Sequence, residues 1–211
     1  MDAQILKKHG GISRRALIRL SLILILSGII GKVFFENRLN SSSDFLVFGG
    51  IALLLKALSL ASIPILLFLL SGEFEGIKNK KGAGAILLLT TLVLEIFYNL
   101  IESGNLIDNE TRSPVAAFLL CFIIACLWER EKRFRIPLNI VIIVSALFWA
   151  RVLSIEEGIP CILVFSSCFF FRKKEILRPF SMVLALGIVT LINPMYIIAL
   201  PTPALLHLYR E

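Results

Sequence analysis

Charged residues are scarce in this sequence. Asp, Glu, Lys and Arg make up 18% of the 211 residues, whereas soluble domains carry about 25% charged residues. Hydrophobic residues reach 57%, against about 45–50% in soluble domains, and apolar runs recur along the whole length. The composition therefore excludes a soluble domain of ordinary size and predicts a single integral membrane domain over residues 1–211.

Histidine and cysteine are also rare, which limits metal and redox chemistry. The histidines are His9 and His207, and no histidine stands near a cysteine, so we expect no zinc site or other metal site. Cysteines inside apolar runs usually behave as small hydrophobic residues. All four cysteines lie inside apolar runs: Cys121, Cys126, Cys161 and Cys168. The sequence also lacks a Gly-rich phosphate loop and a Ser–His–Asp set in a recognisable context.

Apolar runs of helical length predict an all-α, polytopic transmembrane bundle with about eight spans. Several runs have only about 15 residues, fewer than the roughly 20 that cross a bilayer. The second run is interrupted at Pro64, and the last contains several prolines, which disfavour a continuous helix. The predicted spans are residues 16–35, 45–71, 83–102, 114–128, 137–152, 158–171, 179–193 and 195–209.

The distribution of basic residues predicts that both termini lie in the cytoplasm. Basic residues are enriched in cytoplasmic loops of membrane proteins. With an inside N-terminus and eight spans, 17 of the 22 Lys and Arg residues fall on the cytoplasmic side. The other side receives Lys32, Arg38, Arg112 and Arg151, and Lys56 lies within a span. An error of one span among the early helices would destroy this alternation.

The net charge of +7 does not indicate nucleic-acid binding. The basic residues form short clusters between apolar runs, which is the pattern that membrane topology requires, and not one extended basic surface. We therefore expect membrane lipids as partners and no nucleic acid.

Two ionisable side chains are expected within the membrane, where each is a candidate functional residue because its burial is costly. Lys56 lies near the middle of the second span and Glu95 in the outer half of the third, so adjacent spans could pair them. Asn99 lies four residues after Glu95, on the same helical face. A carboxylate away from water holds a proton more readily, which suits a catalytic base near neutral pH. The alternatives are a structural Lys56–Glu95 pair, or a second run split into two half-helices, which would put Lys56 near an interface.

Two further candidates lie near span ends. His207 is near the inner end of the last span, where it could act as a base or be merely a tolerated polar tip. Arg151, with Glu156 and Glu157, forms a charged outer rim, for which solvation is the default interpretation. We consider Glu95, Asn99 and His207 as catalytic candidates, and Lys56 and Arg151 as candidates for substrate binding.

The order of motifs between residues 63 and 100 resembles the TraX family, membrane proteins associated with pilin N-acetylation in conjugative systems. Residues 63–70 (Ile-Pro-Ile-Leu-Leu-Phe-Leu-Leu) resemble the family's Phe-Pro-Ile-Phe-x-Phe-Leu-Leu stretch. A Gly-Glu-Phe element at 72–74 and a basic turn follow, as in the family. Residues 95–100 (Glu-Ile-Phe-Tyr-Asn-Leu) resemble a Glu-Ile-Pro-Phe-Asn-Leu stretch, and residues 157–172 resemble a Tyr-Gly-Ile helix that ends in Phe-Arg. The Leu-Tyr-Arg at 208–210 is similar to a Tyr-Asn-Gly-Lys-Arg-Gly ending.

This resemblance implies a membrane acyltransferase ancestry and a bacterial cytoplasmic (inner) membrane location. Glu95 with Asn99 would then orient or deprotonate an acceptor amine on a small membrane-protein substrate, and Lys56 would balance charge. The cytoplasmic basic loops would attract acetyl-CoA as an anionic donor, with no cofactor bound permanently.

The chain also departs from the family pattern. The first helix of the family carries an Asp-His pair, whereas Gly28 and Ile29 stand at the matching place, and Phe97 replaces the proline of the second motif. The alternative is therefore a non-catalytic accessory subunit of a membrane complex, packed against partner subunits, or a small transporter. Short helices that carry small residues favour this alternative, because small residues allow close helix packing.

Overall fold

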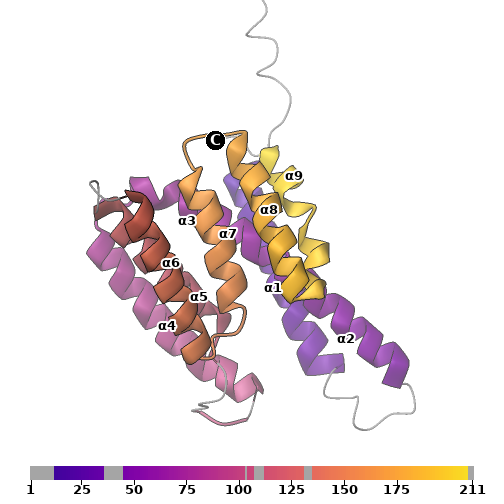
Figure 1. Ribbon diagram of the computed structural model, residues 1–211. Coiled ribbons are helices and arrows are strands. Elements are labelled where there is room, and N and C mark those ends of the chain that lie inside the picture. The colour runs from indigo at the N-terminus through magenta and orange to yellow at the C-terminus, as the bar shows by residue number, and fades with distance from the viewer. Residues whose placement is uncertain (1–11, 36–44, 103, 107–111, 131–134, 209–211) are drawn as a thin grey trace, which may run out of the picture.

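The computed structural model describes residues 12–35, 45–102, 104–106, 112–130 and 135–208. Within these ranges the protein is an all-α bundle without a β-strand (Figure 1), which confirms the all-α part of the predicted fold class. The helices run up and down the bundle. They are α1 (Arg14–Ile30), which continues as the π-helix η2 (Gly31–Phe35), α2 (Phe45–Leu60), α3 (Ser62–Glu73), the 3-10 turn η4 (Phe74–Gly76), α4 (Lys80–Glu102), α5 (Pro114–Arg130), α6 (Arg135–Val152), α7 (Gly158–Phe170), α8 (Leu177–Ile192), the 3-10 helix η5 (Pro194–Ala199) and α9 (Thr202–His207).

Short polar side chains cap several helix starts. Ser13 Oγ accepts a hydrogen bond from Ala16 N (3.3 Å) at α1, and Asn79 Oδ1 accepts one from Gly82 N (2.9 Å) at α4. Ser113 and Asn193 accept from the backbone two residues on, at α5 and η5. Each cap satisfies a backbone donor that has no partner inside its helix, so these residues fix where the elements begin.

The second predicted run is two helices, as one of the sequence alternatives proposed. Proline lacks a backbone N–H and cannot donate to the carbonyl four residues before it. Pro64 would have to bond the carbonyl of Leu60, and α2 ends at Leu60. The predicted interruption is therefore confirmed, with the break at Ala61, three residues before Pro64, and α3 beginning at Ser62.

Three stretches are long and apolar enough to cross a membrane: Arg14–Phe34, Val47–Gly76 and Lys80–Ile101. Shorter apolar helices follow at Pro137–Val152, Gly158–Phe170 and Leu177–Ile192. The last predicted span is not one helix, since it divides into η5 and α9 around the prolines. Its predicted end at Tyr209 lies outside the described residues, as does Arg38.

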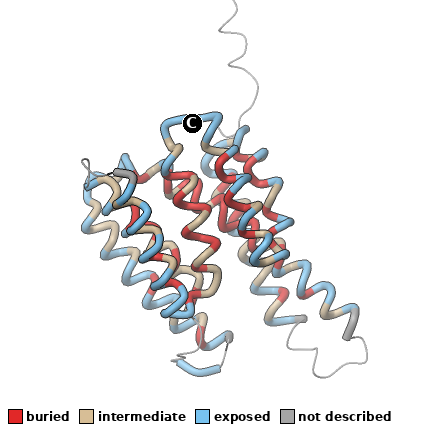
Figure 2. The backbone as a smooth tube through the Cα atoms, in the orientation of Figure 1, coloured by how far each residue is buried: buried red, intermediate tan, exposed pale blue. Residues whose placement is uncertain are grey.

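Helix α7 forms the centre of the bundle. Nine of its 13 residues are buried, and it packs against α3, α5, α6 and α8 (Figure 2). Phe165 and Phe169 on α7 stack with ring centroids 5.3 Å apart. Phe74 meets Phe169 edge to face at 5.5 Å and Phe122 at 5.4 Å. The cysteines Cys121, Cys161 and Cys168 are free and buried in this core, as expected of small hydrophobic residues.

Glycines bring α1 and α2 close together. A Cβ at Gly28 would lie 2.6 Å from the Cβ of Ser59, and one at Gly31 would lie 2.9 Å from the Cβ of Leu55. Real Cβ atoms do not approach that closely, so larger side chains at these positions would push the two helices apart. Small residues thus allow close packing between these two helices of the same chain.

Side-chain contacts define two ends of the bundle. At the first, which we name the basic end, Arg14 of α1 pairs with Glu73 of α3, and Lys80 of α4 pairs with Glu129 of α5. At the same end, Ile12 N donates to Leu208 O (3.1 Å) after α9. The starts of α1, α4, α6 and α8 and the ends of α3, α5, α7 and α9 therefore lie together, and the ends of α4 and α6 and the starts of α5 and α7 lie at the opposite end.

Candidate functional site

The most extensive polar network lies at the opposite end, where three carboxylates gather. Glu95 comes from the last turns of α4, while Glu156 and Glu157 come from the turn between α6 and α7. The network joins these carboxylates to α2, α4, α5 and η5 through hydrogen bonds and ion pairs.

Glu95 anchors the start of α5. Its Oε2 accepts a hydrogen bond from Ser113 N (3.0 Å), and its Oε1 lies 3.6 Å from Nη1 of Arg112. The Glu95 side chain is only 14% exposed. Asn99, on the same face and buried, donates to Leu106 O at 3.4 Å. The shared face predicted for these two residues is confirmed, and their contacts hold the end of α4 to the segment that follows it.

A short backbone bridge connects this anchor to the turn between α6 and α7. Arg112 N donates to Ser154 O (3.0 Å), and Glu156 N donates to Arg112 O (2.8 Å). Ser154 and Glu157 have φ values of 50° and 56°, in the left-handed region that costs non-glycine residues about 1–3 kcal/mol when imposed. The turn is thus held in a strained conformation that directs Glu156 and Glu157 to different partners.

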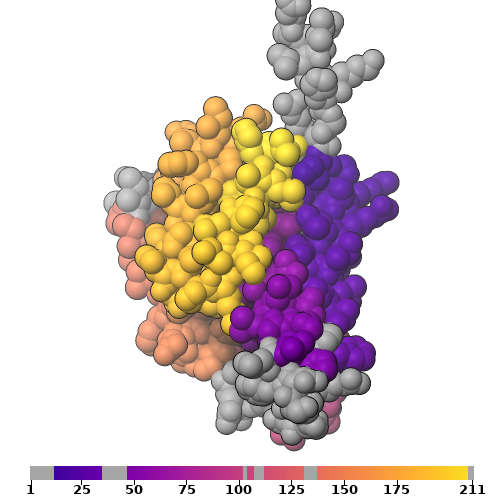
Figure 3. All heavy atoms as spheres, turned by 90° about the vertical axis from the view of Figure 1, so that its right-hand side faces the viewer, coloured from indigo at the N-terminus to yellow at the C-terminus, as the bar shows by residue number. Residues whose placement is uncertain are grey.

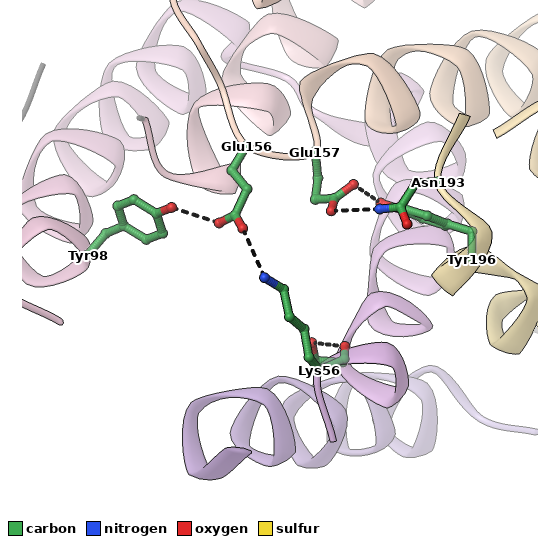
Figure 4. A network of polar contacts seen from close by, with 7 residues as sticks. Lys56, Tyr98, Glu156, Glu157, Asn193 and Tyr196 are labelled. Carbon is green, nitrogen blue, oxygen red and sulfur yellow. Dashed lines mark hydrogen bonds and ion pairs between the residues drawn. The ribbon is translucent and has the colours of Figure 1, made fainter. Parts of the chain in front are cut away.

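Glu156 connects α2 with α4 (Figure 4). Tyr98 of α4 donates its hydroxyl hydrogen to Glu156 Oε2 at 2.7 Å. Lys56 Nζ of α2 lies 3.9 Å from Glu156 Oε1, and the Lys56 side chain is 50% exposed. The distance is at the outer limit of an ion pair, so Lys56 is only loosely held.

Glu157 is bound more firmly, on the side of η5. Tyr196 donates to Glu157 Oε2 at 2.7 Å, and Asn193 Nδ2 donates to Oε1 at 3.4 Å. Burial raises the pKa of the Glu157 carboxyl above its usual value, although the hydrogen bond from Tyr196 lowers the pKa and offsets part of this effect. The carboxyl therefore accepts a proton at higher pH than an exposed glutamate does.

The predicted pair between Lys56 and Glu95 is wrong. Helix α4 packs against α5, so Glu95 meets Arg112, and Lys56 meets Glu156 instead. Lys56 and Glu95 nevertheless belong to one network, because Arg112 is bonded to Glu156 through the backbone bridge.

The three catalytic candidates are not brought together. Glu95 and Asn99 lie at the opposite end, whereas His207 is exposed at the end of α9, next to Leu208 at the basic end. Arg151 is exposed at the end of α6 and forms no ion pair with the residues that the structure describes. The described part of the chain also contains no group of three or more His, Cys, Asp or Glu residues that could hold a metal.

The sequence interpretation missed the roles of two carboxylates and two tyrosines. Glu156 and Glu157 were expected, with Arg151, to form a solvated rim. Instead, Tyr98 and Tyr196 donate hydrogen bonds to these carboxylates. The adjacent acidic pair before Gly158 was the available signal, but its partners are up to 100 residues away in the chain.

No family model, no curated protein and no solved structure matches this chain. The resemblance to the TraX family accordingly stays a prediction from the sequence motifs.

Proposed function

We propose that this chain is an integral membrane protein that crosses the bilayer eight times, with both termini in the cytoplasm. In this arrangement α2 and α3 form one crossing, and η5 with α9 forms the last. The hydrogen bond between Ile12 and Leu208 supports an even number, because it puts the first and last described residues at the same end.

The outward surface supports membrane embedding. Large apolar side chains are exposed along the whole of α4 and α8, among them Leu89 at 63% and Leu191 at 87%. Soluble monomers rarely expose continuous apolar patches of more than a few hundred Å². In a bilayer, lipid chains would cover these surfaces and keep them out of water.

The short helices are compatible with this topology because of where they lie. Helix α7 has 13 residues and spans about 20 Å, less than the roughly 30 Å hydrocarbon layer. Its neighbours on several sides are protein helices, so α7 does not have to match the lipid thickness by itself. The basic end would face the cytoplasm under the positive-inside rule, and the TraX resemblance suggests a bacterial inner membrane.

Within this topology we propose that the network at the opposite end binds a positively charged group of a membrane partner or substrate. The observation that supports this function is the charge of the Glu156–Glu157 turn. Among the described residues, Lys56 alone provides a cation within ion-pair distance of this turn, at 3.9 Å and half-exposed. An amine of a small membrane protein could displace Lys56 from Glu156 without breaking the tighter bond from Tyr98.

Acetyl transfer is the competing proposal, and the separation of the candidate residues weighs against it. A cytoplasmic acetyl-CoA would be attracted to the basic end, beside His207. Glu95 lies 15 residues along α4 from Lys80, or about 22 Å at 1.5 Å per residue. The donor would have to pass through most of the bundle to reach an acceptor amine at Glu95, so the non-catalytic function is better supported.

The test uses purified protein in neutral nanodiscs, with dodecylamine as the amine probe and dodecanol as its uncharged match. We expect dodecylamine to raise the Tm above the dodecanol value, and Glu156→Gln to reduce that difference. Glu75→Gln at the basic end is the matched control and should leave the difference unchanged. Equal shifts with both probes would contradict the binding proposal. Label transfer from acetyl-CoA to a small membrane protein, abolished by Glu95→Gln, would establish the enzyme instead.

A further inference from the structure

The arginines at the start of α1 differ in what they contact. Arg14 points to α3 and pairs with Glu73. Arg15 and Arg19 are exposed, and neither forms an ion pair or hydrogen bond with another described side chain. Residues four apart share a helix face, so these two guanidinium groups lie one above the other on the outside of α1.

The same outer face continues as an apolar stripe. Leu22, Ile23 and Leu26 follow Arg19 at helical spacing and are 54%, 63% and 55% exposed. Ile30 extends the stripe by another turn, while Leu17 and Ser21 on the inner face are fully buried. Figure 3 shows α1 as an uncovered column along one side of the molecule.

The geometry points to a binding face for one anionic phospholipid on α1, with its phosphate at Arg15 and Arg19 and an acyl chain along Leu22, Ile23 and Leu26. Guanidinium groups bind phosphate oxygens through two parallel hydrogen bonds. Two cations without a partner among the described side chains, followed by an exposed apolar stripe, match both the charge and the amphipathic shape of such a lipid. This inference rests on the proposed membrane location.

The competing explanation is that Arg15 and Arg19 only orient α1 during insertion, as any cytoplasmic cation does. That role requires positive charge but no lipid preference in the finished protein. The two explanations therefore differ in which lipids the folded protein retains, and in whether lysine can replace arginine fully.

The experiment reconstitutes the full-length protein in vesicles with equal phosphatidylglycerol and phosphatidylcholine, extracts it gently and measures the retained lipids by mass spectrometry. We expect the wild type to retain phosphatidylglycerol preferentially. The double variant Arg15→Gln/Arg19→Gln should lose about fivefold of this preference per arginine, since each basic residue near an anionic lipid surface contributes about that much. Arg15→Lys/Arg19→Lys keeps the two positive charges that orient α1. This variant should retain only part of the preference for phosphatidylglycerol, because lysine cannot bind a phosphate through two parallel hydrogen bonds.

The matched control is Lys173→Gln/Lys174→Gln, which removes the same charge at the same end. Those lysines lie between α7, which is interior, and α8, away from the α1 stripe. An unchanged lipid preference in the α1 double variant would overturn the inference, as would an equal loss in the control. Wild-type protein that fails to float with vesicles of either lipid would contradict the membrane proposal, and the inference would fail with it.

Discussion

Tyr196 donates the hydrogen of its phenolic hydroxyl to Glu157 Oε2 over 2.7 Å, which joins η5 to the residue just before α7. The Tyr196 side chain is completely buried. This bond holds η5 against the start of α7. We therefore expect its loss to destabilise the opposite end of the bundle.

Tyr196→Phe should lower the free energy of unfolding by about 1–3 kcal/mol, because the partly buried carboxylate of Glu157 loses its closest hydrogen-bond donor. The measurement is denaturant unfolding of the detergent-solubilised protein. Tyr98→Phe removes the corresponding bond to Glu156, which is 33% exposed, and should cost less because water can replace the donor. A larger loss from Tyr98→Phe would show that Glu156, and not Glu157, anchors the turn.

The raised pKa of Glu157 makes stability depend on pH. The folded protein binds the proton of the Glu157 carboxyl more tightly than the unfolded chain does. The stability that this group contributes is therefore highest below the ordinary glutamate pKa, and it falls as pH rises toward the raised pKa. Tm measured between about pH 4 and pH 8 should decline relative to Glu157→Gln, which stays neutral. A wild-type curve parallel to that of Glu157→Gln would show that the carboxyl is not perturbed.

A double-mutant cycle should distinguish the observed partner of Lys56 from the one that the sequence suggested. Lys56→Gln and Glu156→Gln should show a coupling of about 0.2–1 kcal/mol, the range of exposed ion pairs. Lys56→Gln and Glu95→Gln should show a smaller coupling, because the two side chains do not touch and are linked only through the backbone bridge between Arg112 and Glu156. Strong coupling in the second cycle would restore the Lys56–Glu95 pair.

The failure of that pairing shows what the sequence could not provide. Hydropathy indicated the depth of Lys56 and Glu95, but not that α4 packs against α5 and leaves α2 to α1 and η5. The all-α class and the break near Pro64 could be predicted, since both follow from local composition and backbone chemistry. The partners of Glu156 and Glu157 depend on left-handed backbone at two residues that are not glycine, for which no local pattern gives a signal.

Gly28→Leu should separate α1 from α2 and destabilise the protein by about 1–3 kcal/mol through overpacking. Gly50→Leu on α2 is the matched control, because a Cβ there meets no atom within 4 Å. Thermal unfolding in detergent should show a lower Tm for the first variant than for the second. Similar Tm values would mean that the two helices can move apart at little cost.

The proposed topology predicts the results of reporter fusions. Fusions at the C-terminus, within residues 78–81 and within residues 172–174 should report the cytoplasm, and a fusion near Asp108 should report the other side, because basic residues stay inside. Activity of paired cytoplasmic and periplasmic reporters measures this directly. A periplasmic C-terminus would require an odd number of crossings.

The central position of α7 has a consequence for biogenesis. A helix of 13 residues is too short to partition alone into a bilayer that roughly 20 residues span. It leaves the ribosome after α3, α5 and α6, which it contacts, but before α8. In the proposed topology, α7 would therefore stay beside the translocon until α8 follows, and the two would enter the lipid together as a hairpin that packs against helices already inserted.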